Sequence, residues 1–202
     1  MTLEKTMKQE LRLLQYPFRE ETIRSLTAGG RVVITGMLHT GRDRLHKYLA
    51  EGGKCPVSLA EGGLFHCGPV VMPDGSGGWS VRAAGPTTSM REEPYMARVI
   101  EGQGLRFVMG KGGMGASTRA ACQRCGCVYL QAVGGAAAVI ATKIRRVTGV
   151  WFLEEFGPTE AMWGLECDGI EAIVGIDAKG ESLYTDVAAA SRLKLDALLD
   201  VR

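Results

Sequence analysis

Three basic residues lie in turns that are rich in glycine and proline. Arg42 directly follows Gly41, Arg91 ends the run GPTTSMR at 85–91, and Lys111 lies in GKGGMG at 110–115. A guanidinium binds a carboxylate through two parallel hydrogen bonds, and an ammonium adds a point charge. Two arginines and a lysine therefore suit a small dicarboxylate better than a single phosphate. Each cation alone has an ordinary interpretation as a solvated surface charge, and only their shared setting at turns favours a common site.

The glycines around Lys111 allow a different interpretation, a dinucleotide site. Gly110, Gly112 and Gly115 fit the pattern G-x-G-x-x-G between an expected strand and an expected helix. The fingerprint also needs an acidic residue about 20 positions further on, to bind a ribose. The sequence has CVYLQAVGG at 127–135 instead, without a carboxylate. The pattern is therefore incomplete, and nucleotide binding stays a weaker alternative.

A second alternative is a metal site at Cys122, Cys125 and Cys127, which form C-x2-C-x-C. Three thiolates need a fourth soft ligand or an open coordination position, and no matching pair of His or Cys lies nearby. Small apolar cysteines at the junction of a helix and a strand often only fill space. We therefore predict buried structural thiols and no metal bound by this chain.

Turn residues and apolar periodicity indicate an α/β domain with a mixed sheet and crossover helices. Hairpins in the first half argue against a purely doubly wound sheet, because the segment 62–84 alternates short apolar runs with glycine-rich turns. The Thr87–Ser89 run has the residue types of helix N-caps. We expect further strands at 31–38, 105–109, 127–133, 147–156, 163–167 and 171–177, and helices at 41–53, 116–125, 135–144 and 186–199.

The first residues have a helical pattern of their own. Leu3, Met7, Leu11 and Leu14 recur at helical spacing, and Pro17 follows. We therefore predict a helical arm over 1–16 and a single domain over 17–202.

Composition excludes several classes of partner. Lys and Arg number 24 against 22 Asp and Glu, a net charge of +2, which is too balanced for binding a nucleic acid along a basic face. Charged residues interrupt the apolar runs at the N-terminus, and the least charged stretch, 127–142, is shorter than the ~20 residues that cross a bilayer. We expect a cytoplasmic protein that binds no membrane, with its six cysteines reduced.

Five motifs in order resemble the beta subunit, or C-terminal domain, of class I iron-sulfur hydro-lyases, the family of fumarate hydratase and L-tartrate dehydratase. They are HTGRDRLHK (39–47), AGPTTSMR (84–91), MGKGGMG (109–115), GCVYLQAVGGAAA (126–138) and GVWFLEEFGPTEAMWGLE (149–166). The resemblance implies a swivelling β/β/α domain that closes over a site shared with an alpha subunit. It implies that the alpha subunit binds a four-iron four-sulfur cluster and that the complex is αβ or α2β2, with a homodimer of the isolated chain as a further state.

The resemblance also implies roles for single residues. Arg42, Arg91 and Lys111 resemble the family's ligands for substrate carboxylates, and Thr87 resembles the hydroxyl that removes or returns the C3 proton. A threonine hydroxyl is a feeble base, so its alkoxide needs nearby cations such as Arg91 and Lys111.

Two further residues match the motifs. His46 matches a histidine of the family, with direct chemistry or the orientation of Asp43 or Arg42 as its two possible roles. Asp43 itself has an ordinary interpretation as a carboxylate in the first turn of a helix.

The sequence departs from the family where a substrate is selected. Relatives usually read R-M-D where this chain has Arg91, Glu92 and Glu93, and the stretch 52–79 is more divergent. We predict a fumarate hydratase beta subunit that interconverts malate with fumarate and water. An L-tartrate dehydratase beta subunit is the first alternative, and a non-catalytic nucleotide- or metal-binding module is the second.

Overall fold

The computed structural model describes residues 11–199. Seven strands form a mixed sheet, two form a separate hairpin, and helices connect them. The strands are β1 (Arg12–Gln15), β2 (Arg31–Gly41), β3 (Gly63–His66), β4 (Val70–Pro73), β5 (Trp79–Ala83), β6 (Phe107–Gly110), β7 (Val128–Gln131), β8 (Ile144–Trp151) and β9 (Met162–Ile176). The helices are α1 (Glu20–Arg24), α2 (Asp43–Ala50), the 3-10 turn η2 (Ser89–Glu92), α3 (Glu93–Gln103), α4 (Ala116–Cys125), α5 (Ala137–Ala141), α6 (Leu153–Phe156) and α7 (Leu183–Leu199).

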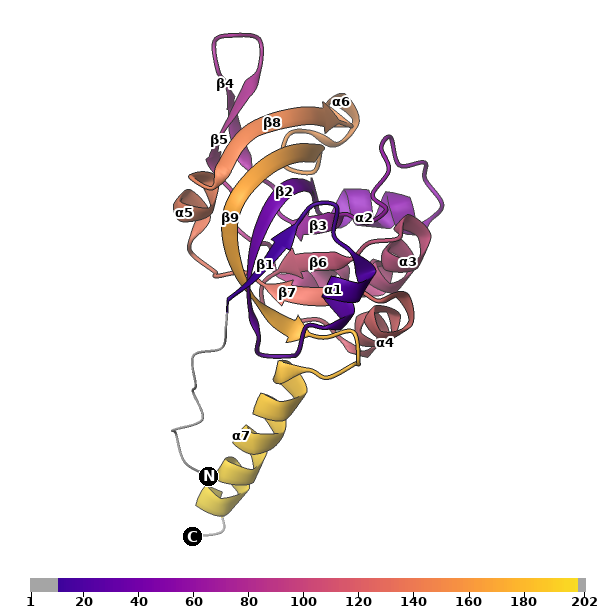
Figure 1. The fold of residues 1–202 in the computed structure, drawn as a ribbon, viewed down its shortest axis with the longest axis vertical. Coiled ribbons are helices and arrows are strands. Elements are labelled where there is room, and N and C mark those ends of the chain that lie inside the picture. Colours follow the sequence, from indigo (N-terminus) through magenta and orange to yellow (C-terminus); the bar gives the residue numbers. More distant parts are fainter. Residues whose placement is uncertain (1–10, 200–202) are drawn as a thin grey trace.

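Five strands of the large sheet close into a ring. β2, β3, β6 and β7 are parallel neighbours, and β9 pairs antiparallel with both β7 and β2. β1 extends the edge of β2, and β8 pairs with the first half of β9 (Figure 1). The mixed sheet and crossover helices that the sequence predicts are therefore confirmed.

The parallel strands separate two apolar layers. Along β6, Phe107 and Met109 point into the ring, whereas Val108 packs under the helices. Leu130 and Tyr129 of β7 alternate in the same way. Strands that are buried on both faces read as continuous apolar runs. Helices α2, α3 and α4 cover the outer layer on one side of the ring (Figure 1).

Two elements extend away from the ring. The hairpin β4–β5 projects at one end, and helix α7 projects at the other (Figure 1). None of the described residues of α7 is buried, and Val187, Leu193 and Leu198 are exposed. Over residues 11–199, the helices are all too short or too polar to cross a membrane.

The helical arm predicted for 1–16 is wrong over Arg12–Gln15, which form strand β1 parallel to β2. Leu14 is fully buried in the ring, whereas Leu13 is 60% exposed, so the side chains alternate as in a strand. A contact with β2 that is distant in the sequence overrides the helical spacing of the leucines. Residues 1–10 lie outside the described residues.

The other expected elements are found with local differences. The antiparallel hairpin within 62–84 is confirmed as β4–β5, but β3 in the same stretch joins the parallel strands instead. The two strands expected at 163–167 and 171–177 are one bent strand, β9, with Gly169 at a positive φ of 84°. The end of the strand expected at 147–156 is the short helix α6.

Candidate functional site

The site begins at the carboxyl ends of the parallel strands. β2 ends at Gly41, β3 at His66 and β6 at Gly110, and the parallel register places these ends at one edge of the ring. Arg42 follows the first end and Lys111 follows the last. Ligands bind at this edge in α/β folds, because the turns that follow the strands meet there.

Thr87 lies between two of these strand ends. Its backbone N–H donates to the carbonyl of His66 at 2.6 Å, and its own carbonyl accepts from the N–H of Lys111 at 3.1 Å. The N–H of Ser89 then donates to the carbonyl of Lys111 at 2.8 Å. Residues 87–89, the threonine segment, are therefore hydrogen-bonded to the ends of β3 and β6, and Thr87 lies next to Lys111.

Arg91 and Arg42 meet at one carboxylate, that of Asp43. Arg91 donates from Nε to Oδ1 at 3.2 Å and from Nη2 to Oδ2 at 2.7 Å, in the two-pronged geometry that suits a guanidinium. Arg42 Nη2 lies 4.0 Å from the same Oδ2. The two arginines, 49 positions apart in the sequence, are neighbours at this edge because α2 and η2 pack together.

Arg42 is also braced from the other side. Its Nε lies 3.5 Å from Oε1 of Glu160, whose Oε2 accepts the N–H of Arg44 at 3.0 Å. Arg42 Nε is buried and has no hydrogen-bond partner among the described residues, so the contact with Glu160 is an ion pair only. Gly68 leaves room for the Arg42 side chain, because a Cβ at position 68 would lie 2.7 Å from Arg42 Cδ.

Lys111 has the least constrained of the three cationic heads. Its side chain passes the loop after β7, where a Cβ on Gly134 would lie 3.6 Å from Lys111 Cδ. Within residues 11–199, its ammonium makes no ion pair with a carboxylate. Among residues 11–199, no carboxylate is therefore paired with the Lys111 ammonium beside Thr87.

A buried polar layer lies below the threonine segment. The Ser89 hydroxyl is 2.9 Å from His66 Nδ1 and accepts a hydrogen bond from the Tyr129 hydroxyl at 3.0 Å. Burial lowers the pKa of His66 well below its ordinary value, so this imidazole is neutral at pH 7. The Ser89 side chain therefore fixes the threonine segment to the buried His66 and Tyr129. It makes no helix-cap hydrogen bond.

His46 does not contact Asp43 or the head of Arg42 as the sequence suggested. Its Nδ1 lies 2.8 Å from Oε2 of Glu92, and both side chains are fully buried. The departure from R-M-D drew attention to Glu92 in the sequence, but nothing there indicated that its side chain is buried or that it meets His46.

Residues 2–187 match the family described as Fumarase C-terminus. The chain belongs to this family. A Geobacillus stearothermophilus protein provisionally named fumarate hydratase class I is 49% identical over 182 residues, which are 90% of this chain and 35% of that protein. The chain thus spans about a third of that relative.

Two further relatives have nearly the same length as the chain. A Methanocaldococcus jannaschii protein provisionally named L(+)-tartrate dehydratase subunit beta is 34% identical over 92% of this chain and 99% of its own length. The L(+)-tartrate dehydratase subunit beta of Escherichia coli K12 is 33% identical over 87% of each chain. Membership in the Fumarase C-terminus family confirms the resemblance that the five motifs carried.

The glycine-rich turn of this family member is not open to a phosphate at the start of α4. Glu93 occupies the N-terminus of that helix, where its carboxylate accepts the N–H groups of Gly115, Ser117 and Thr118. The Thr118 hydroxyl donates to the same carboxylate at 2.6 Å. The amides that would bind a pyrophosphate are therefore already used, which argues against the nucleotide alternative.

The cysteine trio does not have the character of an iron-sulfur or zinc site. Cys122 and Cys127 are buried in the apolar layer under the helices. Burial raises the pKa of the Cys127 thiol well above its ordinary value and also raises that of Cys125, as expected for thiols that fill space in an apolar layer. Over residues 11–199, the His, Cys, Asp and Glu side chains form no group of three that could hold a metal ion. The described residues therefore do not fit the family's cluster.

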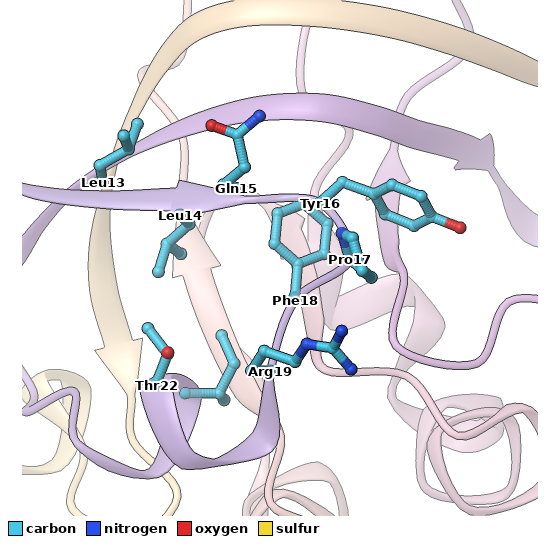
Figure 2. Close-up of a pocket in the computed structure, with 9 residues that line it drawn as sticks. Leu13, Leu14, Gln15, Tyr16, Pro17, Phe18, Arg19 and Thr22 are labelled. Carbon is cyan, nitrogen blue, oxygen red and sulfur yellow. The ribbon is translucent and has the colours of Figure 1, made fainter.

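A cavity of about 300 Å³ lies elsewhere, between β1 and α1. Figure 2 shows its lining, which comes from β1, the turn after it and the first helix. Leu14 and Phe18 form its apolar wall, and Arg19 is its one charged lining residue. None of the residues at the edge of the parallel strands contributes to it, so the cavity and the cations are separate features.

Proposed function

We propose that the chain is the beta subunit of a class I hydro-lyase that interconverts malate with fumarate and water. The observation that supports this most strongly is the meeting of Arg42 and Arg91 at Asp43, beside the paired backbones of Thr87 and Lys111. Three segments that are far apart in the sequence, 42–43, 87–91 and 111, thus contribute to one edge of the ring.

The cations of this edge suit a substrate with two carboxylates. Arg42, Arg91 and Lys111 carry three positive charges, and Asp43 and Glu160 carry two negative ones, which leaves an excess of positive charge for an anion. Asp43 and Glu160 hold the guanidinium groups in place, so that less side-chain entropy is lost when a substrate binds. A four-carbon diacid would then lie between the arginines and the lysine.

Thr87 is our candidate for proton transfer at C3 of the substrate. A hydroxyl must lose its proton to act as a base, and an alkoxide is stable only beside positive charge. Lys111 supplies that charge, since the two residues are hydrogen-bonded through their backbones and its ammonium is not neutralised within the described residues. The neutral His66 below the segment does not compete for this role.

The iron-sulfur cluster of such an enzyme would belong to an alpha partner. Two relatives are named as beta subunits, which supports a hetero-oligomer with an alpha partner. We propose that this complex is αβ or α2β2 and that it is cytoplasmic. We further propose that this chain swivels over the partner to complete the site. The activity would then require both chains.

L-tartrate dehydration is the second candidate, because two relatives carry that name. The substrates differ by one hydroxyl group, and a site that hydrogen-bonds a hydroxyl rejects the analogue that lacks it. Steady-state assays of the chain purified with its alpha partner, with malate, fumarate and L-tartrate, separate the two. We expect turnover of malate and fumarate. Activity with tartrate alone would favour the second candidate, and a complex with a loaded cluster that converts none of the three would refute the proposal.

A further inference from the structure

Two ionisable side chains are completely buried behind the arginines. Glu92 is the last residue of η2, and His46 lies in the middle of α2. Both have 0% exposed side chains, and Glu92 Oε2 lies 2.8 Å from His46 Nδ1. The pair therefore joins two elements that are 46 positions apart in the sequence.

This pair is poorly explained as a stabilising interaction. Glu92 Oε1 and His46 Nε2 are buried without hydrogen-bond partners among the described residues. A buried pair of ionisable groups with unsatisfied atoms is often no more stabilising than apolar side chains of similar volume. Stability alone therefore gives no reason for a glutamate at this position.

The pair lies directly below the arginine site. Glu92 follows Arg91 in the sequence, and the N–H of His46 donates to the carbonyl of Arg42 at 3.0 Å. The elements α2 and η2 are thus linked twice, at the surface by Asp43 and Arg91 and in the interior by His46 and Glu92. The surface link is 53% exposed at Arg91 and 33% at Asp43, so Asp43 alone restrains the Arg91 guanidinium only in part.

Both ends of η2 are held from below by histidines. Ser89, its first residue, contacts His66, and Glu92, its last residue, contacts His46. The two imidazole rings pack edge to face with centroids 5.0 Å apart. Arg91 therefore lies in a turn, η2, whose two ends both contact the buried pair of histidines, His46 and His66.

We propose that Glu92 is a positioning residue, which through His46 fixes the direction of the Arg91 guanidinium relative to Arg42. This inference rests on the proposed function, since the arginines are its substrate ligands. Glu92 touches neither substrate nor reacting atoms, and it acts on the distance between two guanidinium groups that must match the two ends of a diacid.

The test replaces Glu92 in the chain purified with its alpha partner. Glu92→Met removes the bond and keeps the volume, and Glu92→Gln keeps a hydrogen bond to His46. We expect Glu92→Met to lower kcat/KM for malate about tenfold, mainly through KM, because the ground-state clamp is disturbed. We expect Glu92→Gln to stay within about threefold of wild type and the midpoint of thermal unfolding of Glu92→Met to be unchanged or raised. Glu166→Gln, on the exposed face of β9, is the matched control.

A double-mutant cycle shows whether Glu92 acts through Arg91. In an Arg91→Ala background, Glu92→Met should have little further effect, because no guanidinium remains to be positioned. Wild-type kinetics in Glu92→Met, or losses that simply add in the double variant, would overturn the inference. A lowered unfolding midpoint with unchanged kinetics would show a purely structural residue and would overturn it as well.

Hydrogen exchange separates this inference from the proposed function. In the full chain, Glu92→Met should speed exchange in 87–92, where the N–H of Arg91 donates to the Thr88 carbonyl at 3.3 Å, and Glu92→Gln should not. A complex that is inactive toward all three diacids would refute the hydro-lyase function, whatever the exchange shows. Unchanged exchange in Glu92→Met would refute the positioning role, whatever the activity.

Discussion

Two regions of this molecule pair arginines with carboxylates, and they differ in what lies beneath the pairs. At the edge of the parallel strands, Arg91 pairs with Asp43 above the buried Ser89 and Glu92. Between β8 and β9, Arg146 pairs with Glu166 directly across the strands. A neighbouring pair there joins Arg145 and Asp168.

The antiparallel pairs lie above an apolar layer. Ala161, Trp163 and Leu165 of this region are buried in a cluster that also includes the half-buried Val147. Cross-strand charge pairs over such a layer are ordinary surface features that contribute little to stability. An exposed ion pair is therefore a candidate for function when buried polar groups hold the elements that carry it.

The largest contrast is expected from removing one arginine in each region. Arg91→Ala in the chain purified with its alpha partner should lower kcat/KM for malate tens-fold or more, because a substrate carboxylate loses a charge-assisted hydrogen bond worth about 1.5 to 3 kcal/mol. Arg146→Ala should leave the kinetics unchanged. Steady-state assays check both, and equal kinetics in the two variants would remove the distinction between the regions.

Glu93→Ala should destabilise the site region without touching an arginine. Its carboxylate accepts three backbone N–H groups and the Thr118 hydroxyl at the start of α4. Losing a charged helix cap should lower the free energy of unfolding by about 2 kcal/mol. Urea unfolding measures the change. Glu93→Gln should recover part of the loss, and full stability in Glu93→Ala would contradict the capping role.

A histidine between the two regions should make stability depend on pH. His39 of β2 lies opposite Gly164 of β9, and burial lowers its pKa from 6.5 to about 4. Between pH 6.5 and pH 4 the unfolded chain binds a proton that the folded chain does not, so stability falls as the pH falls through this window.

A variant isolates this contribution. His39→Gln should reduce the loss of stability between pH 7 and pH 5 by on the order of 1 to 2 kcal/mol, as measured by urea unfolding at both values. His66 adds a loss of the same sign in both proteins, because its pKa is also lowered by burial. The same pH dependence in wild type and variant would show that His39 is not held neutral.

The smallest effect is expected from the antiparallel region. Arg146→Ala should change the free energy of unfolding by less than about 1 kcal/mol, because the Arg146 side chain is 72% exposed. Urea unfolding in low and high salt measures it, and the effect should shrink with salt. A loss of more than about 2 kcal/mol in the free energy of unfolding would mean that the exposed ion pairs of β8 and β9 stabilise the fold substantially.

Local signals in the sequence predicted most of the elements. The helix expected at 116–125 is α4, because Gly126 takes the left-handed conformation that ends it. Helix α3 was missed although it carried a signal, since Met96, Val99 and Ile100 have helical spacing and Gly104 follows. Strand β1 could not be predicted, because its leucines match a helix until β2 is placed beside them.

The site could be predicted only in part, because some of its contacts join segments that are distant in the sequence. Gly-rich turns marked Arg42, Arg91 and Lys111 as candidates, because strand ends and glycines can be recognised from the sequence alone. The pairing of Arg91 with Asp43 and of Arg42 with Glu160 depends on packing between segments. The same holds for the bond between His46 and Glu92. No spacing rule predicts which buried imidazole meets which carboxylate.

The closed ring of strands also bears on how such enzymes can be rearranged. One edge of the ring carries all the proposed site residues of this chain, which are Arg42, Thr87, Arg91 and Lys111. A gene fusion or fission at the borders of the ring-forming unit would therefore keep these residues together. The relatives fit this modularity, since the same unit makes up 35% of one protein and 99% of another. Chimaeras that exchange the whole unit between members of the family should therefore transfer all four residues in a single step.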